Sequence, residues 1–289
     1  MTPFSIAGIQ MFVSATHENI SAMKLRTEVA LARFPWVNMI MFSELAPFGP
    51  LIDNHPETIT NQIEIFQELA VKHGIWIIPG SMFERRESGV FNTSVVINPE
   101  GVIIGRYDKM FPFMPYEQGV TGGTEFLVFD VPSVGRFGFS ICYDIWFPET
   151  TRTLAAMGAE VLLHPVLTGT TDRDVELAIA RATAAQFQCY VFDINGIGAG
   201  GIGRSCVVGP GGNMLYEARG SEEIIPIEID MDLVRHQRSL GQNGLGQVLK
   251  SFRDKNVDFS VYDKTKFDHA YHESLGPLQM ARRHPHNLT

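Results

Sequence analysis

The sequence predicts an α/β fold in which two similar sheet-and-helix layers pack as one domain. Apolar, strand-like runs alternate with helical patterns, and each half of the chain contains a strand–turn–strand unit, at residues 92–107 and 205–217. No linker or low-complexity stretch separates the two halves. With 289 residues, 45% of them hydrophobic, the chain is long enough to bury a substantial core.

The first half contains six predicted elements, in the order strand, helix, strand, helix, strand and hairpin. They lie at residues 4–9, 19–34, 37–42, 60–73, 75–83 and 92–107. Apolar residues recur every three or four positions in both helical segments, and Asn19 is placed to cap the first helix. The second strand leads directly to Glu44, and the hairpin leads to Lys109.

The second half repeats this alternation. Strands are predicted at residues 126–131, 137–141, 161–164 and 190–194, helices at 148–157 and 173–187, and hairpin strands at 205–208 and 213–217. Pro148 suits the first position of its helix, where no backbone N–H is needed. Beyond about residue 231 the pattern fades into a polar tail. We therefore expect one domain over residues 1–230 and an extension over 231–289 that packs on the domain or on a partner subunit.

Composition narrows the class of protein. The net charge of -9 and a pI near 5.5 argue against a nucleic-acid-binding protein and suit a protein that acts on small molecules. The three cysteines give no disulfide framework and no CxxC motif, which fits a reducing compartment. Gln10 interrupts the first apolar run, which we interpret as a strand rather than a signal peptide. Since no apolar run approaches the roughly 20 residues of a membrane span, we expect a cytoplasmic protein that does not bind membranes.

Cys142 is the best-placed candidate nucleophile. It follows the apolar run at residues 137–141 and precedes the helix that begins at Pro148. At such a turn the strand fixes the thiol, the turn exposes it, and nearby backbone N–H groups can stabilise an oxyanion. The ordinary alternative is a small buried core residue, which describes Cys189 and Cys206 well because both lie within apolar strand runs.

Three charged residues give Cys142 possible partners. Glu44 is a candidate general base, and Lys109 is a candidate source of positive charge for a thiolate and an oxyanion. Glu117 is placed to orient Lys109 or the nitrogen of a substrate. Taken singly, each has an ordinary explanation, as a solvated loop carboxylate or a surface lysine. Together they favour a Cys-Glu-Lys hydrolase.

The motifs around these residues make the sequence recognisable. Phe42-Ser43-Glu44-Leu45, the segments 105–109 and 115–117, and the segment 142–149 occur in an order and spacing that resemble the nitrilase superfamily of carbon–nitrogen hydrolases, over about residues 4–230. One departure lies near Gln186, where that superfamily usually carries a glutamate and this chain has a neutral residue.

The resemblance implies a four-layer αββα sandwich with its site at the strand ends. It implies that Cys142 is the nucleophile, Glu44 the base, Lys109 an oxyanion stabiliser and Glu117 a supporting fourth residue. The backbone N–H of Tyr143 would be the second oxyanion donor. The reaction would pass through a thioester. No metal or organic cofactor is implied, and the superfamily forms homodimers or larger homo-oligomers.

The residues next to Cys142 favour an amidase. Cys142-Tyr143-Asp144 is similar to the amidase branches, which predicts hydrolysis of a small, largely neutral carboxamide to a carboxylic acid and ammonia. Branches that act on carbamoyl amino acids or dicarboxylate monoamides often carry an arginine shortly after the cysteine, where this chain has Ile145 and Trp146. Arg173 is the remaining candidate for a carboxylate clamp.

The substrate pocket is predicted from aromatic residues near the site. Phe48, Phe113, Tyr143 and Trp146 are candidate pocket walls, although core packing explains aromatic residues equally well. Two other functions stay open. One is a nitrilase or an N-carbamoyl amine hydrolase of the same superfamily, and the other is a catalytically silent binding protein on the same fold.

Three further patterns are interpreted as structural. The glycine-rich segment 196–203 follows a predicted strand, but no helix follows it, so it lacks the context of a dinucleotide-binding loop. His164 lies in an apolar run and is expected to be a hydrogen-bonded residue of the core or of the pocket edge rather than a catalytic base, and at the pocket edge it is a fifth candidate for binding substrate. His284 and His286 lie in a tail without further metal ligands.

Overall fold

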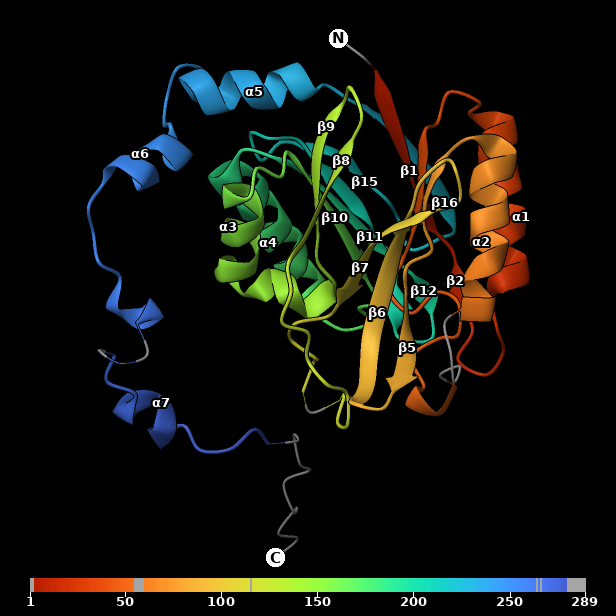
Figure 1. Ribbon diagram of the computed structural model, residues 1–289, viewed down its shortest axis with the longest axis horizontal. Helices are drawn as coiled ribbons and strands as arrows, with labels where there is room; N and C mark the ends of the chain where they lie inside the picture. Colours follow the sequence, from red (N-terminus) through yellow and green to blue (C-terminus); the bar gives the residue numbers. More distant parts are fainter. Residues whose placement is uncertain (1–2, 55–59, 115, 264, 266, 280–289) are drawn as a thin grey trace, which may run out of the picture.

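Two β-sheets face each other, and each carries a pair of helices on its outer face (Figure 1). The computed structural model describes residues 3–54, 60–114, 116–263, 265 and 267–279. The arrangement confirms the predicted α/β class and the αββα sandwich.

The first sheet has seven strands in the order β16-β1-β3-β4-β6-β5, with β7 paired to β6. The strands are β1 (Phe4–Gln10), β3 (Met39–Phe42), β4 (Trp76–Ile78), β5 (Ser81–Arg86), β6 (Gly89–Ile97), β7 (Ile103–Asp108) and β16 (Glu223–Ile229). Helices α1 (Ile20–Arg33) and α2 (Thr60–His73) cover its outer face (Figure 1). A short 3₁₀ helix, η1 (Ile52–Asn54), precedes α2.

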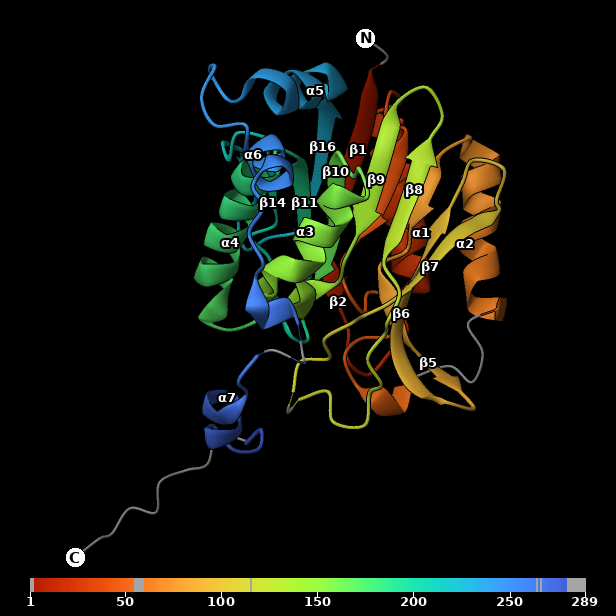
Figure 2. The same cartoon turned by 60° about the vertical axis from the view of Figure 1, so that its left-hand side comes forward.

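The second sheet has six strands in the order β15-β14-β11-β10-β9-β8. They are β8 (Leu127–Val131), β9 (Gly135–Phe139), β10 (Val161–Val166), β11 (Tyr190–Asn195), β14 (Cys206–Val208) and β15 (Met214–Glu217). Helices α3 (Pro148–Ala156) and α4 (Asp172–Phe187) cover this sheet, and the 3₁₀ helix η2 (Cys142–Trp146) precedes α3 (Figure 2). A small sheet joins β2 (Phe12–Val13), β12 (Ile197–Gly198) and β13 (Gly201–Ile202).

The buried apolar side chains form three clusters, which lie between the layers of the sandwich. The largest apolar cluster fills the space between the two sheets, where Phe4 and Phe129 both contact Phe137. A second cluster lies between the first sheet and α1 and α2, and a third lies between the second sheet and α3 and α4. Because both faces of the central strands are covered, β3 and β10 are buried along their whole length, and all their residues except His164 are apolar.

Parallel pairing brings the ends of these strands to one edge. Strands β1, β3 and β4 run parallel, as do β9, β10 and β11. Their carboxyl ends therefore meet at the same edge of the sandwich. The backbone N–H of Glu44, just after β3, donates to the carbonyl of Val166 at the end of β10 at 3.2 Å, which joins the two sheets there.

Three details of the sequence prediction need correction. The single strand expected at residues 75–83 is two strands, because Gly80 adopts φ +81 between them. Strand β16 was missed, although it pairs with the whole of β1. Asn19 occupies the N-cap position of α1, but its side chain bonds Ser14 rather than the helix.

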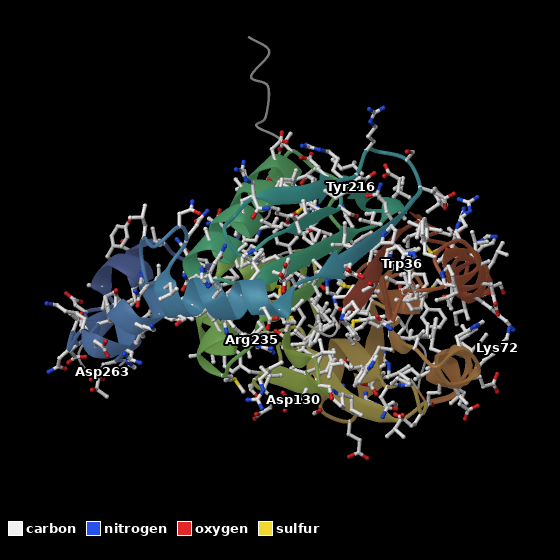
Figure 3. All side chains as sticks on the ribbon, turned by 90° about the horizontal axis from the view of Figure 1, so that it is seen from above. Trp36, Lys72, Asp130, Tyr216, Arg235 and Asp263 are labelled. Atoms are coloured by element: carbon white, nitrogen blue, oxygen red, sulfur yellow. The ribbon has the colours of Figure 1, made fainter. Side chains whose placement is uncertain are left out.

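The last part of the chain leaves the sandwich. Helix α5 (Met231–Leu240) packs on the body through Met231 and Val234, and Arg235 bonds Glu160 at 2.8 Å (Figure 3). After it comes α6 (Val248–Asp254), whose Leu249 packs against the α3–α4 layer and whose Phe252 ring lies 4.6 Å from the guanidinium of Arg152. Next come η3 (Ser260–Tyr262) and α7 (Ala270–Ser274), and none of these three elements has a buried residue. Figures 1 and 2 show α7 well away from the sheets. We call residues 241–279 the C-terminal arm.

No helix in the described part of the chain is both long enough and apolar enough to span a membrane.

Candidate active site

The four predicted catalytic side chains meet at the carboxyl edge of the sandwich. The Nζ atom of Lys109 lies 2.9 Å from Oε1 of Glu44 and 2.6 Å from Oε2 of Glu117. Cys142 lines the same cavity as Glu44, and the charge of Glu44 acts on its thiol. All of these groups except Glu117 are buried, so their charges act on one another with little screening by water.

Asn92 is a fifth polar residue that the sequence analysis did not single out. Its Nδ2 atom donates to Oε1 of Glu44 at 2.8 Å and to Oε1 of Glu117 at 3.1 Å. Its backbone carbonyl accepts the N–H of Lys109 at 2.9 Å. Asn92 therefore fixes both carboxylates and the lysine backbone. The available signal was an asparagine inside the strand run at residues 92–97, where asparagine is depleted.

The turn after β9 holds Cys142 in an unusual backbone conformation. Cys142 has φ +46, in the left-handed region that non-glycine residues rarely adopt, and it is 8% exposed. Such backbone strain clusters at functional sites. Cys142 is the first residue of η2, so the N–H of Tyr143 lies in the first turn, where backbone donors have no partner within the helix.

Asp144 fixes this turn to its surroundings. Its carboxylate accepts the N–H of Ile141 at 2.9 Å, the hydroxyl of Tyr107 at 2.7 Å and the N–H of Phe111 at 2.9 Å. Burial raises the pKa of Asp144 to about 6, although these three donors lower it. Asp144 thus ties the nucleophile turn to the segment that carries Lys109.

Burial and charge determine the proton affinities of the site. Burial raises the pKa of Glu44, which Lys109 lowers only in part. Burial also raises the pKa of the Cys142 thiol, and the charge of Glu44 adds to the rise. Lys109 behaves differently, because Glu44, Cys142 and Glu117 together outweigh the effect of burial and hold its pKa well above its usual value. The lysine is charged, and the resting thiol is neutral.

A cavity of about 380 Å³ opens onto these residues. Cys142, Glu44, Lys109 and Glu117 line it, together with Asp53. The apolar part of its lining is Leu45, Pro50, Leu51, Ile52, Phe83, Phe113, Val120 and Leu167. The site is therefore a mostly apolar cavity with a compact charged group at the nucleophile, as expected for a small-molecule site.

Of the five residues predicted to bind substrate, only Phe113 lines this cavity. The ring of Tyr143 packs against Phe113 with centroids 5.0 Å apart, and Trp146 packs behind Tyr143 at 6.1 Å. Phe48 packs against the core beneath α1 and α2. His164 is buried, with Nδ1 2.8 Å from the Ser140 hydroxyl, and burial lowers its pKa to about 4.

The structure rules out Arg173 as a carboxylate clamp. Its guanidinium is buried and pairs with Asp193 at 2.6 Å and with Glu176 at 3.2 Å. The glycine-rich segment 196–203 contains β12 and β13 and is followed by β14 rather than by a helix, as predicted. His284 and His286 lie outside the described residues. Within the described ranges, no three His, Cys, Asp or Glu side chains are grouped so as to hold a metal ion.

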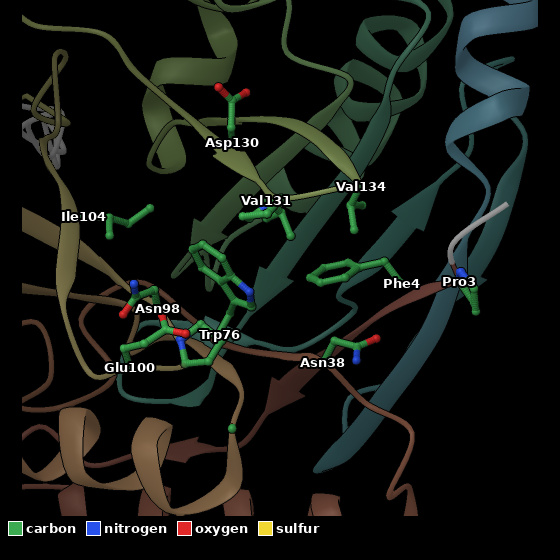
Figure 4. A pocket seen from close by; sticks show the side chains of 13 residues that line it. Pro3, Phe4, Asn38, Trp76, Asn98, Glu100, Ile104, Asp130, Val131 and Val134 are labelled. Carbon is green, nitrogen blue, oxygen red and sulfur yellow. The ribbon is translucent and has the colours of Figure 1, made fainter.

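A second cavity of about 530 Å³ lies at the opposite edge, near the first residues of β1 and β4. Figure 4 shows Phe4, Trp76 and Asp130 among the side chains that line it. Its Asp130 carboxylate is paired with Arg136 at 2.8 Å. None of the predicted catalytic residues lines this cavity.

Known proteins resemble this chain in sequence. A 2-oxoglutaramate amidase of Bacillus subtilis is 33% identical over 171 residues, which cover 57% of this chain and 66% of the relative. A deaminated glutathione amidase of Dictyostelium discoideum is 30% identical over 193 residues, covering 60% and 66%. The matched region thus spans just under two thirds of both relatives. An N-carbamoylputrescine amidase of Arabidopsis thaliana is 29% identical over 230 residues, covering 71% and 72%.

Solved structures resemble it in fold. A carbon-nitrogen hydrolase from Helicobacter pylori superposes with a TM-score of 0.78 at 26% identity, covering 91% of this chain and 98% of that one. A Saccharomyces cerevisiae member of branch 10 of the nitrilase superfamily gives a TM-score of 0.75 at 25% identity, covering 82% and 93%. Residues 6–239 match the family model described as carbon-nitrogen hydrolase. The chain therefore belongs to the carbon–nitrogen hydrolase family, within the nitrilase superfamily.

Proposed function

We propose that this protein is a cysteine-dependent amidase that hydrolyses a small, largely neutral carboxamide to a carboxylic acid and ammonia. The observation that carries the proposal is the buried contact of Lys109 with both Glu44 and Glu117, beside a neutral thiol at the wall of a 380 Å³ cavity. This arrangement places a base, a nucleophile and a fixed positive charge around one point.

In the first step, the sulfur of Cys142 attacks the amide carbonyl carbon while Glu44 takes the thiol proton. Negative charge develops on the carbonyl oxygen, where Lys109 Nζ and the N–H of Tyr143 stabilise it. Glu44 then passes its proton to the leaving nitrogen. The C–N bond breaks, ammonia leaves, and a thioester remains on Cys142.

In the second step, Glu44 takes a proton from a water molecule, which attacks the thioester carbonyl. The C–S bond breaks, the acid is released, and the proton returns to the sulfur. Glu117 acts through Lys109, because it holds the ammonium at a second contact beside the one with Glu44. Asn92 keeps the two carboxylates at their separate places around the lysine.

The charges around the cavity favour a substrate without a carboxylate. Lys109 is the one lysine or arginine that lines the cavity within the described residues, and both Glu44 and Glu117 occupy it. The chain has no lysine or arginine at residues 34–71, 110–135 or 153–172, which contribute most of the lining. Recognition of a substrate carboxylate uses such a cation. Asp53 adds a negative charge to the lining and repels an anion further.

A matched substrate panel tests the reaction. Pentanamide, pentanenitrile, N-butylurea and glutaramate share a similar length and differ in the reacting or distal group. We expect ammonia and pentanoate from pentanamide, with a lower kcat/KM for glutaramate. Ammonia from the nitrile but not from the amide would assign a nitrilase instead. Carbon dioxide together with ammonia from the urea would assign an N-carbamoyl amine hydrolase, the activity named for the Arabidopsis relative.

Cys142→Ala tests the nucleophile. Removal of the thiol leaves no atom that can form the thioester, so turnover should be lost while thermal unfolding stays close to that of the wild type. Mass spectrometry of the wild-type protein quenched during turnover should show the acyl group on Cys142. Turnover by the alanine variant would exclude the assignment, and so would an acyl group on another residue. No turnover by the wild type on any member of the panel would favour a silent binding protein.

We further propose that residues 231–289 form an extension whose arm packs on a second copy of the chain. Apolar side chains of the arm are exposed, including Leu245, Phe252, Phe259, Tyr262 and Tyr271. Such a series of exposed apolar residues is typical of an interface. Light scattering should report a dimer or a larger assembly, and truncation after Leu240 should reduce its mass. A full-length monomer at micromolar concentration would contradict the proposal.

A further inference from the structure

A second buried polar network touches the nucleophile from the side of α4. Oγ1 of Thr168 lies 3.9 Å from the sulfur of Cys142, and the same hydroxyl donates to Oε1 of Glu176 at 3.0 Å. Oε2 of Glu176 accepts from Arg173 at 3.2 Å, and Arg173 is paired in turn with Asp193 at 2.6 Å. The proposed mechanism uses none of these four residues.

The backbone of Thr168 is fixed on both sides. Its N–H donates to Oδ1 of Asn195 at 3.0 Å, and its carbonyl accepts from Nδ2 of Asn195 at 3.0 Å. Nδ2 of Asn195 also donates to the carbonyl of Gly203 at 2.7 Å, which anchors the amide at the end of β11. Thr168 is 8% exposed and Asn195 is fully buried. These contacts hold the backbone of Thr168 in place, and rotation of its hydroxyl hydrogen requires no movement of that backbone.

That hydrogen has two possible acceptors, and the second exists only during the reaction. In the resting site Cys142 is a neutral thiol, so the hydroxyl hydrogen points to Glu176. Once Glu44 has taken the thiol proton, the sulfur is a thiolate and can accept a hydrogen bond. Glu176 keeps its contact with Arg173 if the hydroxyl turns away, so the rotation leaves no buried carboxylate without a partner.

We propose that Thr168 is a further catalytic residue, whose hydroxyl turns from Glu176 to the Cys142 thiolate, and that Glu176 and Asn195 are positioning residues that hold it there. The inference rests on the proposed role of Cys142 as nucleophile. The turn moves one hydrogen by rotation about the C–O bond and transfers no proton. The distance of 3.9 Å is long for a hydrogen bond to sulfur, and contacts of this kind tighten when substrate is bound.

The charges that face the sulfur make such a donor useful. Burial raises the pKa of the Cys142 thiol most, and Glu44 and Glu176 add to the rise, whereas Lys109 lowers it. Lys109 acts from the end of β7, while Thr168 acts from the end of β10 on the side of Glu176. A donor on that side offsets the repulsion between the Glu176 carboxylate and a thiolate.

The test compares variants that keep the shape of the site and change the hydroxyl. Thr168→Val removes the hydroxyl at nearly constant volume, and Thr168→Ser restores it without the methyl group. Thr27→Val is the matched control, because Thr27 is a buried threonine as well and its hydroxyl donates to the Met23 carbonyl at 3.0 Å, far from the site. Alkylation of Cys142 by iodoacetamide is followed by peptide mass spectrometry from pH 6 to pH 10, with thermal unfolding as the check on folding.

Thr168→Val should react about tenfold more slowly at pH 7.5, with its pH profile shifted to higher pH, because a hydrogen bond to a charged group is lost. Thr168→Ser and Thr27→Val should react like the wild type. Equal rates for Thr168→Val and the wild type would overturn the proposal, and so would a serine variant as slow as the valine variant. If Thr168→Val does not fold, Thr168→Ala takes its place, and its alkylation rate should be lowered by the same factor. A Thr168→Ala protein that is alkylated as fast as the wild type would overturn the proposal.

Amide turnover by the wild type is measured in the same samples. Absence of turnover would refute the proposed amidase function, while the ratio of alkylation rates still decides the role of Thr168.

Discussion

Lys109→Met is the most informative single perturbation of this site. The substitution removes the charge and keeps most of the volume of a side chain that is 2% exposed. Lys109 is the cation shared by Glu44, at 2.9 Å, and Glu117, at 2.6 Å. Without it, the two neighbouring carboxylates share the Nδ2 donor of Asn92, and only Glu117 keeps a further donor, the N–H of Phe113.

The expected losses of stability and of turnover follow from the removal of this shared cation. Removing one partner of a buried ion pair costs about 3–5 kcal/mol, because the other partner stays buried without compensation. Since a domain of this kind is stable by about 5–15 kcal/mol, the variant should fold but unfold much more easily. Turnover should fall by a factor of about 1,000 or more, since the variant also lacks an oxyanion stabiliser.

The loss should depend on pH in a defined direction. Burial already raises the pKa of Glu44 above 4.5, and Lys109 is the main group that lowers it. In the variant the folded-state pKa of Glu44 therefore rises further above its unfolded value. A carboxyl group with a raised folded pKa is most favourable to the fold when it is protonated, so stability falls as pH rises above about 4.5. The variant should be closest to the wild type near pH 5 and furthest from it near pH 8.

Urea unfolding followed by tryptophan fluorescence at pH 5 and pH 8 measures this difference. Lys24→Met, at an exposed position of α1, is the control and should change the free energy of unfolding by less than about 0.5 kcal/mol. The double variant Lys109→Met/Glu117→Gln should recover part of the loss, because only one carboxylate then lacks its cation. A Lys109→Met protein within 1 kcal/mol of the wild type at pH 8, on the scale of a surface substitution, would refute the reasoning.

Three further predictions concern the frame around the site. His164, whose pKa burial lowers from 6.5 to about 4, should make the wild type lose about 3 kcal/mol as pH falls through that window, and His164→Asn should remove this slope from urea titrations. Gly80→Ala should destabilise by more than Gly74→Ala in thermal unfolding. Both glycines have positive φ, but an added Cβ lies 2.0 Å from the carbonyl oxygen of Ser43 only at Gly80. In Asp144→Asn, the new amide N–H₂ group faces one of the three donors that the carboxylate accepts, so the variant should lose about 1–3 kcal/mol in urea unfolding. Equal stability of the variant and the wild type would count against the role of Asp144 in fixing the turn at Cys142.

The proposed catalytic set could be selected from the sequence because its residues follow strand-like runs. Glu44, Lys109 and Cys142 each come just after such a run, and carboxyl ends of parallel strands gather at one edge. Hydrophobic periodicity and the hairpin turns located most strands of both sheets. Strand β16 escaped because Pro226 interrupts its pattern, and the structure shows why proline is tolerated there: β16 is an edge strand that pairs only with β1.

Residues that reach the site only through the packing of the two sheets could not be found from the sequence pattern. Asn92 and Thr168 lie within or just after apolar runs, and only the packing of the two sheets brings them to the charged group and to the sulfur. The aromatic residues show that closeness in sequence can also mislead. Tyr143 and Trp146 are close to Cys142 in sequence, but η2 turns them toward Phe113 and the α3–α4 layer rather than into the cavity. Sequence distance from a nucleophile does not determine which face of a turn a side chain occupies.

The charges of the site explain how a thiol that is neutral at rest can act as the nucleophile. Glu44 and Glu117 carry two negative charges against the one positive charge of Lys109, so loss of the thiol proton to solvent would add a second uncompensated negative charge to a buried group. Transfer of the same proton to Glu44 leaves the total charge unchanged, because the negative charge passes from the carboxylate to the sulfur. Burial raises the pKa of Glu44 and of Cys142 together, which keeps proton transfer between them within reach. The site therefore favours proton transfer within the pair over a free thiolate, and this is why the base, the cation and the sulfur have to be held by one set of buried contacts.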